Sequence, residues 1–577
     1  FYGKIHLTMS KSYAVRENLG KDDRGKLKSF SDTLAHLLFH RGIKSEDEAL
    51  AFMSPSYDKH INDPFLLVGM EKVVSRILKA IDKKEKVAIF SDYDADGIPG
   101  AVVLHDFFKL IGFNNFINYI PDRQEEGFGL SNFAIEDIHK QGATLLITID
   151  CGITAIDEVG FANGLGIDVI ITDHHLPSEL GLPNSFANIN PKISPDYPEQ
   201  MLCGAGVIFK VVQAILLKER FGLAPGAEKW LMDMVGIATL SDMVPIQGEN
   251  RAFACFGLMV LRKTRRVGLL RLLKTLKIDP KRITEDDVGF MITPRINAAS
   301  RMGISYDAFK LLTTTDEAEA EILVKNLEKA NTERKSTTAY LANEVRKMIE
   351  AKYSPYFSNK VIVAGNPSWQ PCILGLVAGS LAESESKPDF LWGKEGSKEE
   401  LKGSCRGIAG VSVSTIMSAV PSGIFLNFGG HHQAGGFSVS YESVHLLDEE
   451  IEKAFLKAGE VGDSVESYVD FSVDPESVND RLLRDLEKLS PFGIANEKPT
   501  FLINSAKILD LTFFGKEKNH LKLIIERNTW PLEAICFFVG ADMLKKVEKG
   551  MTVKIVGNIE RNFFGRNSVR VRIIDIV

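Results

Sequence analysis

The stretch Val87–Gly97, with the sequence VAIFSDYDADG, constrains the fold more than any other part of the chain. A short apolar run is followed directly by three aspartates at every second position, Asp92, Asp94 and Asp96. Such a run is typical of a buried parallel strand, and α/β proteins bind ligands beyond the carboxyl ends of these strands. Three carboxylates this close repel one another unless a cation lies between them, and hard divalent cations prefer oxygen ligands. The stretch therefore predicts a metal site at the edge of a parallel sheet.

Two other structures have the same spacing of aspartates. One is an acidic turn that binds nothing, and this alternative stays open at the level of the motif alone. The other is an EF-hand, whose loop would begin at Asp92. The last position of that loop would then be Val103, where a glutamate is required, and the preceding run is strand-like rather than helical. The EF-hand is therefore excluded.

Apolar segments and helical segments alternate after this stretch. The apolar segments lie at 116–120, 144–149 and 168–172, and each is separated from the next by a segment with helical character. Alternation at this spacing indicates an α/β fold with a doubly wound parallel sheet.

Two of these apolar segments end in further polar side chains. The segment at 144–149 ends at Asp150, and the segment at 168–172 ends in Asp173, His174 and His175. The carboxyl ends of parallel strands lie along one edge of a sheet. We therefore expect four side chains to converge at this edge: Asp94, Asp96, Asp150 and His174.

The rest of the chain indicates further domains. Positions 316–353 have helical periodicity without glycine or proline, and a helix of this length usually connects two domains. A second α/β pattern follows, and short β-type runs from about residue 464 indicate a small barrel. The expected parts are an N-terminal helical segment (1–70), the first α/β domain (71–310), the connecting helix (311–356), the second α/β domain (357–460) and the barrel (461–577).

The bulk composition is that of a globular protein. The chain has 577 residues, 45% of them hydrophobic and 25% charged, and this length indicates roughly three or four domains. No apolar run reaches ~18 residues and the first residues lack the apolar segment of a signal peptide, so we expect no membrane contact. Six cysteines without a CxxC pair favour free thiols in the reducing cytoplasm over disulfides or a zinc site.

The charge is distributed unevenly. The whole chain carries a net charge of −7, but residues 501–577 contain 13 lysines and arginines against 8 acidic residues. The last 77 residues are therefore net +5 and the remainder is net −12. This asymmetry is expected when one part of a protein binds phosphates and another binds cations.

Seven motifs resemble those of a known family. SDYDADG, TIDCG, TDHH and LSDMVP are similar, in this order, to the four motifs of the DHH phosphoesterase superfamily. GSCRGI, GGHHQAGG and LSPFGIANEKP extend the resemblance to its bacterial branch of 5′→3′ exonucleases specific for single-stranded DNA. It covers the chain from about residue 30. The resemblance implies a DHH domain, a long helix, a DHH-associated domain and a C-terminal OB-type barrel.

The resemblance also implies a catalytic centre with two ions, Mn²⁺ or Mg²⁺. Two ions ~3.5–4 Å apart stabilise a phosphodiester anion and activate water for its hydrolysis. Asp150 would bridge the ions, His175 would contact the scissile phosphate, and Asp92 and Asp173 would orient the ligands. The implied metal ligands are Asp94, Asp96, Asp150, His174 and Asp242.

Other residues are implied to bind the DNA strand. A pocket for the 5′-terminal phosphate would contain Arg123, Ser404 and Arg406, because forked guanidinium groups and a hydroxyl suit a phosphate dianion. Further contacts are implied for Arg295, Asn297, Arg301 and His431. In the barrel, basic residues interleaved with aromatic ones suit a single strand. They are Lys516, Lys518, Lys522, Arg561, Arg566 and Arg570, among Phe513, Phe514, Phe563 and Phe564.

Five positions depart from the family pattern. Phe90 stands where many relatives have a histidine, which predicts more water and weaker binding at one metal. Gln370 replaces a usual histidine, whereas Cys372, Ser300 and Ala495 each replace a usual glycine. None of these changes removes an implied metal ligand.

The function expected from the resemblance is 5′→3′ hydrolysis of single-stranded DNA to mononucleotides, in DNA repair and recombination. The expected partners are 5′-phosphorylated single-stranded DNA, a single-strand-binding protein and a RecQ-type helicase, with the enzyme itself a monomer. Two alternatives stay open. One is a DHH phosphodiesterase of oligoribonucleotides or cyclic dinucleotides, whose members are usually shorter and lack the basic barrel. The other is a scaffold without activity, a branch marked by the loss of ligand residues.

Overall fold

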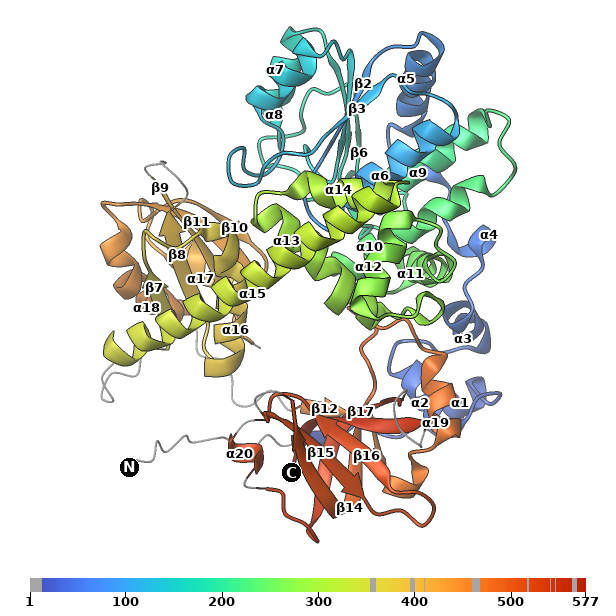
Figure 1. Ribbon diagram of the computed structural model, residues 1–577, viewed down its shortest axis with the longest axis vertical. Coiled ribbons are helices and arrows are strands. Elements are labelled where there is room, and N and C mark those ends of the chain that lie inside the picture. The colour runs from blue at the N-terminus through green and yellow to red at the C-terminus, as the bar shows by residue number, and fades with distance from the viewer. Residues whose placement is uncertain are drawn as a thin grey trace. The chain divides into compact units, whose positions relative to one another are not determined.

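The chain forms two compact units, and each is composed of separated parts of the sequence. In the computed structural model, one unit contains residues 1–62, 243–255 and 466–577, and the other contains 63–242 and 256–465 (Figure 1). The two are described separately below as the barrel unit and the catalytic unit. The structure describes residues 13–352, 360–394, 400–408, 410–458, 467–515, 518–539, 541–544, 546–562 and 568–577.

The catalytic unit contains the predicted parallel sheet. Its strands lie in the order β3-β2-β4-β5-β6 and all neighbouring pairs are parallel. The first four strands confirm the apolar segments expected from the sequence. The fifth, a short edge strand, was not expected. The strands are β2 (Val87–Ser91), β3 (Phe116–Tyr119), β4 (Leu145–Ile149), β5 (Asp168–Thr172) and β6 (Ala187–Ile189).

Helices cover both faces of this sheet. On one face, α7 (Asn132–Lys140) and α8 (Ile156–Gly164) share a hydrophobic core with alternate residues of the strands. On the other face lie α5 (Met70–Asp82), α6 (Gly97–Leu110) and α9 (Gly204–Lys218), as Figure 1 shows. The alternation of strand residues between two buried faces explains why the strands read as continuous apolar runs.

A group of helices extends the catalytic unit, and a long helix, α15, runs through it to the second sheet. This helix spans Glu317–Lys352, close to the range expected from its periodicity. Its first part packs against the preceding helices, and its later part packs against the next domain through Leu341 and Val345. The helices that it contacts are α12 (Val267–Leu276), α13 (Thr293–Arg301) and α14 (Ser305–Thr313), with a π-helical turn at Asp287–Ile292 before α13. Helix α10 (Met232–Ser241) also belongs to the catalytic unit, whereas α11 (Gly248–Leu261) begins in the barrel unit and ends in the catalytic unit.

The second sheet of the catalytic unit has the order β10-β11-β9-β8-β7. Helix α16 (Pro371–Glu385) covers one face, and α17 (Val413–Ala419) and α18 (Leu447–Ala458) cover the other. A parallel β7–β8 pair continues into antiparallel strands. The strands are β7 (Ile362–Gly365), β8 (Asp389–Lys394), β9 (Glu400–Arg406), β10 (Phe425–Gly430) and β11 (Ala434–Ser440).

The barrel unit contains a closed five-stranded barrel. Its strands follow the order β14-β15-β16-β18-β17, and pairing of β17 with β14 closes the ring. The predicted α/β architecture followed by an OB-type barrel is therefore confirmed. The strands are β14 (Thr500–Phe514), β15 (His520–Ile525), β16 (Leu532–Cys536), β17 (Thr552–Arg561) and β18 (Val569–Ile576), with β13 (Phe471–Val473) added beside β14.

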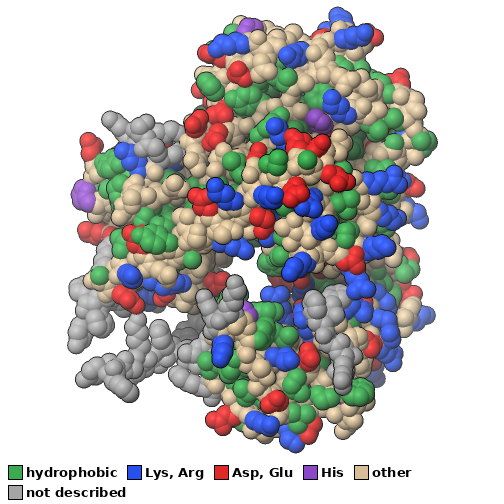
Figure 2. Space-filling view, in the orientation of Figure 1, with side chains coloured by type: hydrophobic (Ala, Val, Ile, Leu, Met, Phe, Trp, Pro, Cys, Tyr) green, Lys and Arg blue, Asp and Glu red, His purple; other side chains and the backbone are tan. Residues whose placement is uncertain are grey.

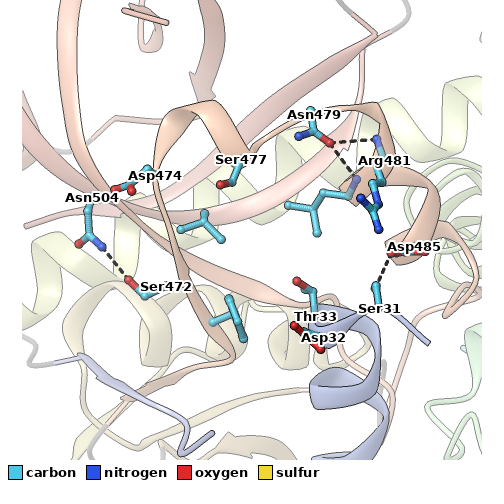
Figure 3. Close-up of a pocket in the computed structure, with 13 residues that line it drawn as sticks. Ser31, Asp32, Thr33, Ser472, Asp474, Ser477, Asn479, Arg481, Asp485 and Asn504 are labelled. Carbon is cyan, nitrogen blue, oxygen red and sulfur yellow. Dashed lines mark hydrogen bonds between the residues drawn. The ribbon is translucent and has the colours of Figure 1, made fainter. Parts of the chain in front are cut away.

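The N-terminal helices belong to the core of the barrel unit. Leucines of α2 (Asp32–Phe39) and of α19 (Asp480–Glu487) share one hydrophobic cluster with the inward residues of the barrel. A hollow of about 420 Å³ lies between the beginnings of these two helices and β13, and Figure 3 shows the residues that line it. There the Ser31 hydroxyl donates a hydrogen bond of 2.6 Å to Asp485. The N-terminal segment is thus packed on the barrel rather than folded as a separate core.

The segment 243–255 is inserted into the same unit. The guanidinium group of its Arg251 lies 3.6 Å from the ring centre of Phe52 and donates hydrogen bonds to the backbone oxygens of Phe52, Ser490 and Pro491. Among the described residues, no helix is long and apolar enough to cross a membrane.

Candidate active site

The aspartate loop after β2 is held in a tight turn. Oδ1 of Asp94 accepts hydrogen bonds from the backbone amides of Asp96, at 2.8 Å, and Gly97, at 3.1 Å. A side chain at position 97 would place its Cβ 2.4 Å from the carbonyl oxygen of Asp92, so the turn requires glycine. The sequence after the strand therefore fixes all three aspartates at the carboxyl edge of the sheet.

Asp96 is bound by the first turn of a second helix. Its two carboxylate oxygens accept hydrogen bonds from the amides of Gly204, at 2.6 Å, and Ala205, at 2.7 Å, at the beginning of α9. The positive end of the helix dipole favours a carboxylate at this place. A Cβ on Gly204 would lie 2.5 Å from the Cβ of Asp150, so this glycine allows α9 to approach the carboxylates.

Asp150, His174 and Asp242 converge on Asp96, although they follow different elements. Asp150 follows β4 with a left-handed backbone (φ +62°), and Asp242 ends α10. Nε2 of His174 lies 3.1 Å from Oδ1 of Asp150, 3.6 Å from Oδ2 of Asp242 and 3.7 Å from Oδ2 of Asp96. The convergence expected from the strand ends is therefore observed, and it includes Asp242.

His175 is oriented by Asp173. Nδ1 of His175 lies 2.8 Å from Oδ1 of Asp173 and 3.9 Å from Oδ1 of Asp150. The same Asp173 carboxylate accepts hydrogen bonds from the amides of His174, His175 and Ile153. Asp173 therefore fixes the orientation of His175 at the rim of the cluster.

Buried ligand-type atoms lack hydrogen-bond partners where these side chains meet. Among the described residues, Oδ1 of Asp92, Oδ1 of Asp150, Nε2 of His174 and Oδ2 of Asp242 are buried without such a partner. Buried polar atoms are rarely left so, and cations bound among these side chains would satisfy them. Three sets have ligand atoms within 4.8 Å of one another: Asp150, His174 and His175; Asp96, His174 and Asp242; and Asp92, Asp94 and Asp150.

Asp92 belongs to one of these sets, whereas the sequence motifs implied only a supporting position for it. Asp92 is 5% exposed, and its carboxylate faces Asp94 and Asp150. The sequence does indicate this position, since Asp92 is the first residue after the strand and has the same spacing as the two aspartates that follow. The family motif, however, implies only those two as metal ligands.

The charges of the cluster favour a cation. Burial, reinforced by Asp94, raises the pKa of Asp96 to about 7, and burial, reinforced by Asp96, raises that of Asp242 to about 9. Burial lowers the pKa of His174 to about 3, so its imidazole is neutral and has a lone pair available. Without a cation, these carboxyl groups ionise only at unusually high pH, so a bound cation would stabilise their charged form. Carboxylates beside a neutral imidazole suit Mn²⁺ or Mg²⁺.

A second hollow, of about 620 Å³, lies between the two sheets of the catalytic unit. We call it the cleft pocket. The guanidinium group of Arg123 lies 5.1 Å from the ring centre of Tyr93, on the side of the metal-type cluster. Both domains contribute to its wall, including Tyr93, Arg123, Phe128, Cys372, Lys402 and Ser404.

Arg406 lies next to Ser404 at the beginning of α16. Both residues are on β9 and face the helix, where a Cβ on Gly375 would lie 2.9 Å from Nη2 of Arg406 and 3.5 Å from Oγ of Ser404. Nη1 of Arg406 donates a hydrogen bond to the Cys405 carbonyl at 2.8 Å. The absence of a side chain at position 375 therefore gives the guanidinium group room beside the helix.

Three predicted strand-binding residues of the TPRINAASRMG stretch make contacts within the protein. Asn297 accepts a hydrogen bond of 2.9 Å from the amide of Ala95 and so holds the aspartate loop. Arg295 is buried and binds Glu328 and the carbonyl of Met291, whereas Arg301 donates to the carbonyl of Cys372. These contacts give each residue an internal partner, and their contacts with a DNA strand stay predictions.

His431 lies in the turn between β10 and β11. Its side chain is exposed, and its amide donates a hydrogen bond of 2.8 Å to the carbonyl of Ala434. It does not line the cleft pocket.

The comparisons with known proteins cover nearly the whole chain. Models of the DHH family N-terminal domain, the DHHA1 domain and the RecJ OB domain match residues 86–239, 358–457 and 469–575. The single-stranded-DNA-specific exonuclease RecJ of Bacillus subtilis is 34% identical over 565 residues, which is 95% of this chain and 69% of that protein. The chain belongs to the RecJ family. The resemblance found in the motifs is therefore confirmed.

Other RecJ proteins match over similar lengths. The RecJ of Haemophilus influenzae is 29% identical, and the match covers 84% of this chain and 86% of that protein. The crystal structure of Thermus thermophilus RecJ in complex with Mn²⁺ superposes with a TM-score of 0.81 at 25% identity, covering 98% of this chain and 79% of that one. A crystal structure of exonuclease RecJ bound to manganese is 31% identical, with a TM-score of 0.56. The match covers 69% of this chain and 96% of that one.

The RecJ-type OB barrel has fewer free cations than its sequence indicates. Arg561 forms a double hydrogen bond with Glu487, and Arg570 binds Glu560. Lys518 and Lys522 remain without an ion pair in the described part of the chain, and acidic side chains are interspersed with basic ones in Figure 2. Lys516, Phe563, Phe564 and Arg566 lie outside the described residues.

The positions that depart from the RecJ pattern lie in different environments. Phe90 is buried and its ring stacks on Tyr119 at 5.6 Å, in the apolar core below the sheet edge. Gln370 precedes α16, and Ser300 donates to the carbonyl of Asn297. Ala495 has a left-handed backbone (φ +59°), which explains why glycine suits this position.

Proposed function

We propose that this protein is a 5′→3′ exonuclease that hydrolyses single-stranded DNA to mononucleotides with two divalent cations, Mn²⁺ or Mg²⁺. One observation supports this proposal above the others. Three overlapping sets of carboxylates and imidazoles, most of them buried, lie at one sheet edge, and four of their ligand-type atoms have no hydrogen-bond partner among the described residues. Membership in a family of exonucleases specific for single-stranded DNA adds the substrate class.

The proposed mechanism assigns a task to each group of side chains. When bound, two cations supply positive charge for the phosphate oxygens and a nucleophilic hydroxide. Asp94, Asp96, Asp150, His174 and Asp242 would hold these cations, and Asp150 would contribute to both sites. Asp92 is a further ligand candidate, because its carboxylate belongs to one of the three sets.

His175 contacts the scissile phosphate in this proposal. Burial lowers the pKa of its imidazole, but the hydrogen bond with Asp173 outweighs this effect and raises the pKa above its usual value. Asp173 therefore favours a proton on Nδ1 and a cationic ring, which suits an anion.

The direction of hydrolysis comes from the cleft pocket. The metal ions alone cannot distinguish the two ends of a strand, whereas Arg123, Ser404 and Arg406 provide donors for a terminal phosphate. Arg123 and Ser404 line the cleft pocket, and Arg406 lies beside Ser404 without lining it. These residues and the metal-type cluster lie in the same unit, where a strand whose 5′ phosphate is bound would reach the cluster with its first phosphodiester. Arg295, Asn297, Arg301 and His431 would contact the following nucleotides.

Several finer assignments stay predictions. They are a role in DNA repair and recombination, a location in the cytoplasm, a monomeric enzyme, and a single-strand-binding protein and a RecQ-type helicase as partners. A phosphodiesterase of oligoribonucleotides or cyclic dinucleotides is disfavoured, because the RecJ-type barrel offers binding surface for a longer strand.

The test uses single strands of DNA and RNA, labelled at the 5′ or the 3′ end, with Mn²⁺ or Mg²⁺ titrated. The proposal expects a 5′ label to appear at once as a mononucleotide, while a 3′ label passes through progressively shorter fragments. Activity should vanish with EDTA. Release of label from the 3′ end first, or hydrolysis restricted to dinucleotides, would contradict the proposal. Asp150→Asn serves as the inactive control.

A further inference from the structure

The ring of Tyr93 lies beneath the guanidinium group of Arg123. Cζ of Arg123 is 5.1 Å from the ring centre, a distance at which an aromatic face attracts a cation. Both side chains line the cleft pocket. Among the described residues, the guanidinium group of Arg123 forms no hydrogen bond and no ion pair. The ring is therefore the group that holds this guanidinium at the wall of the pocket.

The loop that carries Arg123 is closed by hydrogen bonds of its own. The carboxylate of Glu126 accepts one from the amide of Asp122 and one from the hydroxyl group of Tyr119, both at 2.8 Å. Oδ1 of Asp122 accepts another from the amide of Gln124, at 2.7 Å. None of these bonds involves the guanidinium group. The backbone of the loop is thus fixed without Tyr93, whereas the orientation of the Arg123 side chain is not.

The ring itself has a fixed position. Tyr93 is 5% exposed and directly follows Asp92 in the aspartate loop. On one side of Tyr93, the amide of Asp92 donates a hydrogen bond of 3.1 Å to the carbonyl of Ile149 at the end of β4. On the other side, the amide of Ala95 donates one of 2.9 Å to Asn297. The turn that places the ligand-type aspartates therefore also places the ring.

We propose that Tyr93 is a positioning residue for the terminal phosphate, because its ring holds Arg123 in the orientation that receives this group. The inference rests on the proposed function, since it takes Arg123 as a phosphate-binding residue. A guanidinium group that is already ordered loses less conformational freedom when it binds an anion. Because the ring belongs to the aspartate loop, one short segment places both the phosphate-binding cation and the metal-type cluster. Tyr93 thus links recognition of the strand end to the place of cleavage.

The test compares the binding of 5′-phosphorylated and 5′-hydroxyl single strands of one sequence, each with a fluorophore at the 3′ end. Anisotropy in EDTA at fixed salt gives a Kd for each strand. The Kd of the 5′-hydroxyl strand divided by that of the 5′-phosphorylated strand measures how strongly the phosphate is recognised. Thermal unfolding identifies any variant that does not fold.

The variants separate the ring from the hydroxyl group. Tyr93→Leu and Tyr93→Met both remove the ring, so that one can replace the other if it does not fold. Tyr93→Phe removes only the hydroxyl group and keeps the aromatic face. The matched control is Tyr306→Leu, which removes a ring that Nζ of Lys310 approaches at 5.4 Å in the same unit, outside the cleft pocket.

We expect the two ringless Tyr93 variants to lower the ratio by about three- to tenfold, the range that follows from the strength of a partly buried cation–π contact. Tyr93→Phe and Tyr306→Leu should leave the ratio close to that of the wild type. In an Arg123→Ala background, Tyr93→Leu should have no further effect.

An unchanged ratio in a folded ringless variant overturns the inference, and so does a Tyr93→Phe variant that loses as much as Tyr93→Leu. A general distortion of the domain would weaken the binding of both strands alike and leave the ratio unchanged, which also contradicts it. Arg123→Ala alone distinguishes the two levels of the argument. If it lowers the ratio while Tyr93→Leu does not, only this inference fails. If it leaves the ratio unchanged, the proposed phosphate pocket fails with it.

Discussion

Nε2 of His174 and Oδ1 of Asp150 lie 3.1 Å apart, and neither atom makes a hydrogen bond of good geometry in the described structure. Both belong to the same set of ligand-type atoms, and each also belongs to another set. A carboxylate that belongs to two neighbouring sets, as that of Asp150 does, could serve two adjacent ions, whereas the single lone pair of His174 Nε2 could serve one of them. The arrangement supports the proposed metal centre rather than a salt bridge between the two side chains.

Asp150→Asn should therefore reduce hydrolysis of single-stranded DNA by about a hundredfold or more, since even residues behind the ligands change activity by ten- to a hundredfold in metal enzymes. The initial rate of nucleotide release with Mn²⁺ measures it. Asp196→Asn, at an exposed position of the same domain, should remain active. Comparable rates for the two variants would show that Asp150 is not a shared ligand.

Stability without metal should fall as the pH rises from about 4 to about 9. Both carboxyl groups ionise near pH 4 in the unfolded chain, whereas the folded protein keeps a proton on Asp96 up to about pH 7 and on Asp242 up to about pH 9. The folded state then binds more protons than the unfolded state, so the free energy of unfolding decreases with increasing pH.

Bound cations should reverse this trend, because they stabilise the ionised carboxylates and release the protons. Thermal unfolding at pH 7, 8 and 9, with EDTA or with Mn²⁺, tests the prediction. A pH dependence that is identical with and without the metal would contradict it.

Arg406→Ala should slow degradation of 5′-phosphorylated single strands by about ten- to a hundredfold, the range expected for a lost charge-assisted contact of ~1.5–3 kcal/mol. A 5′-hydroxyl strand should be a poorer substrate of the wild type and should lose less from the substitution. The measurement compares the degradation rates of wild type and variant on 5′-phosphorylated and 5′-hydroxyl strands. If the substitution slows both substrates by the same factor, another group recognises the 5′ phosphate.

Lys518→Ala and Lys522→Ala should each weaken single-strand binding and reduce the slope of log affinity against log salt by about 0.7, the value for one phosphate contact on a single strand. Arg561→Ala is the contrasting variant, because its guanidinium group already binds Glu487 and should change the slope less. Titrations at several salt concentrations give the slopes. Equal slopes for the wild type and both lysine variants would remove these lysines from the binding surface.

The sequence was sufficient to predict the parallel sheet and the convergence of its polar residues, because both follow from local patterns and from the common edge of parallel strands. It was not sufficient where a residue depends on partners far along the chain. The capture of Asp96 by the amides of Gly204 and Ala205 is one example, and the ion pair between Arg295 and Glu328 is another. Neither partner has a periodicity or motif that indicates the contact.

The same limitation explains two further differences. Tyr93 and Arg123 belong to different motifs, and nothing in either pattern shows that the ring will lie beneath the guanidinium group. The N-terminal helices have the amphipathic character of any surface helix, so their hydrophobic faces do not identify the barrel as the surface that they cover.

The division of the barrel unit into three distant pieces has a consequence for synthesis of the protein on the ribosome. The leucines of α2, which ends at Phe39, emerge early, but the barrel strands that complete their core begin only at Thr500. The catalytic unit can begin to fold in the meantime, whereas the first helices must wait with their apolar faces uncovered. Domains generally fold as they emerge, and exposed apolar surface favours aggregation. Chaperones that hold nascent chains should therefore influence the yield of this protein more than its stability once folded.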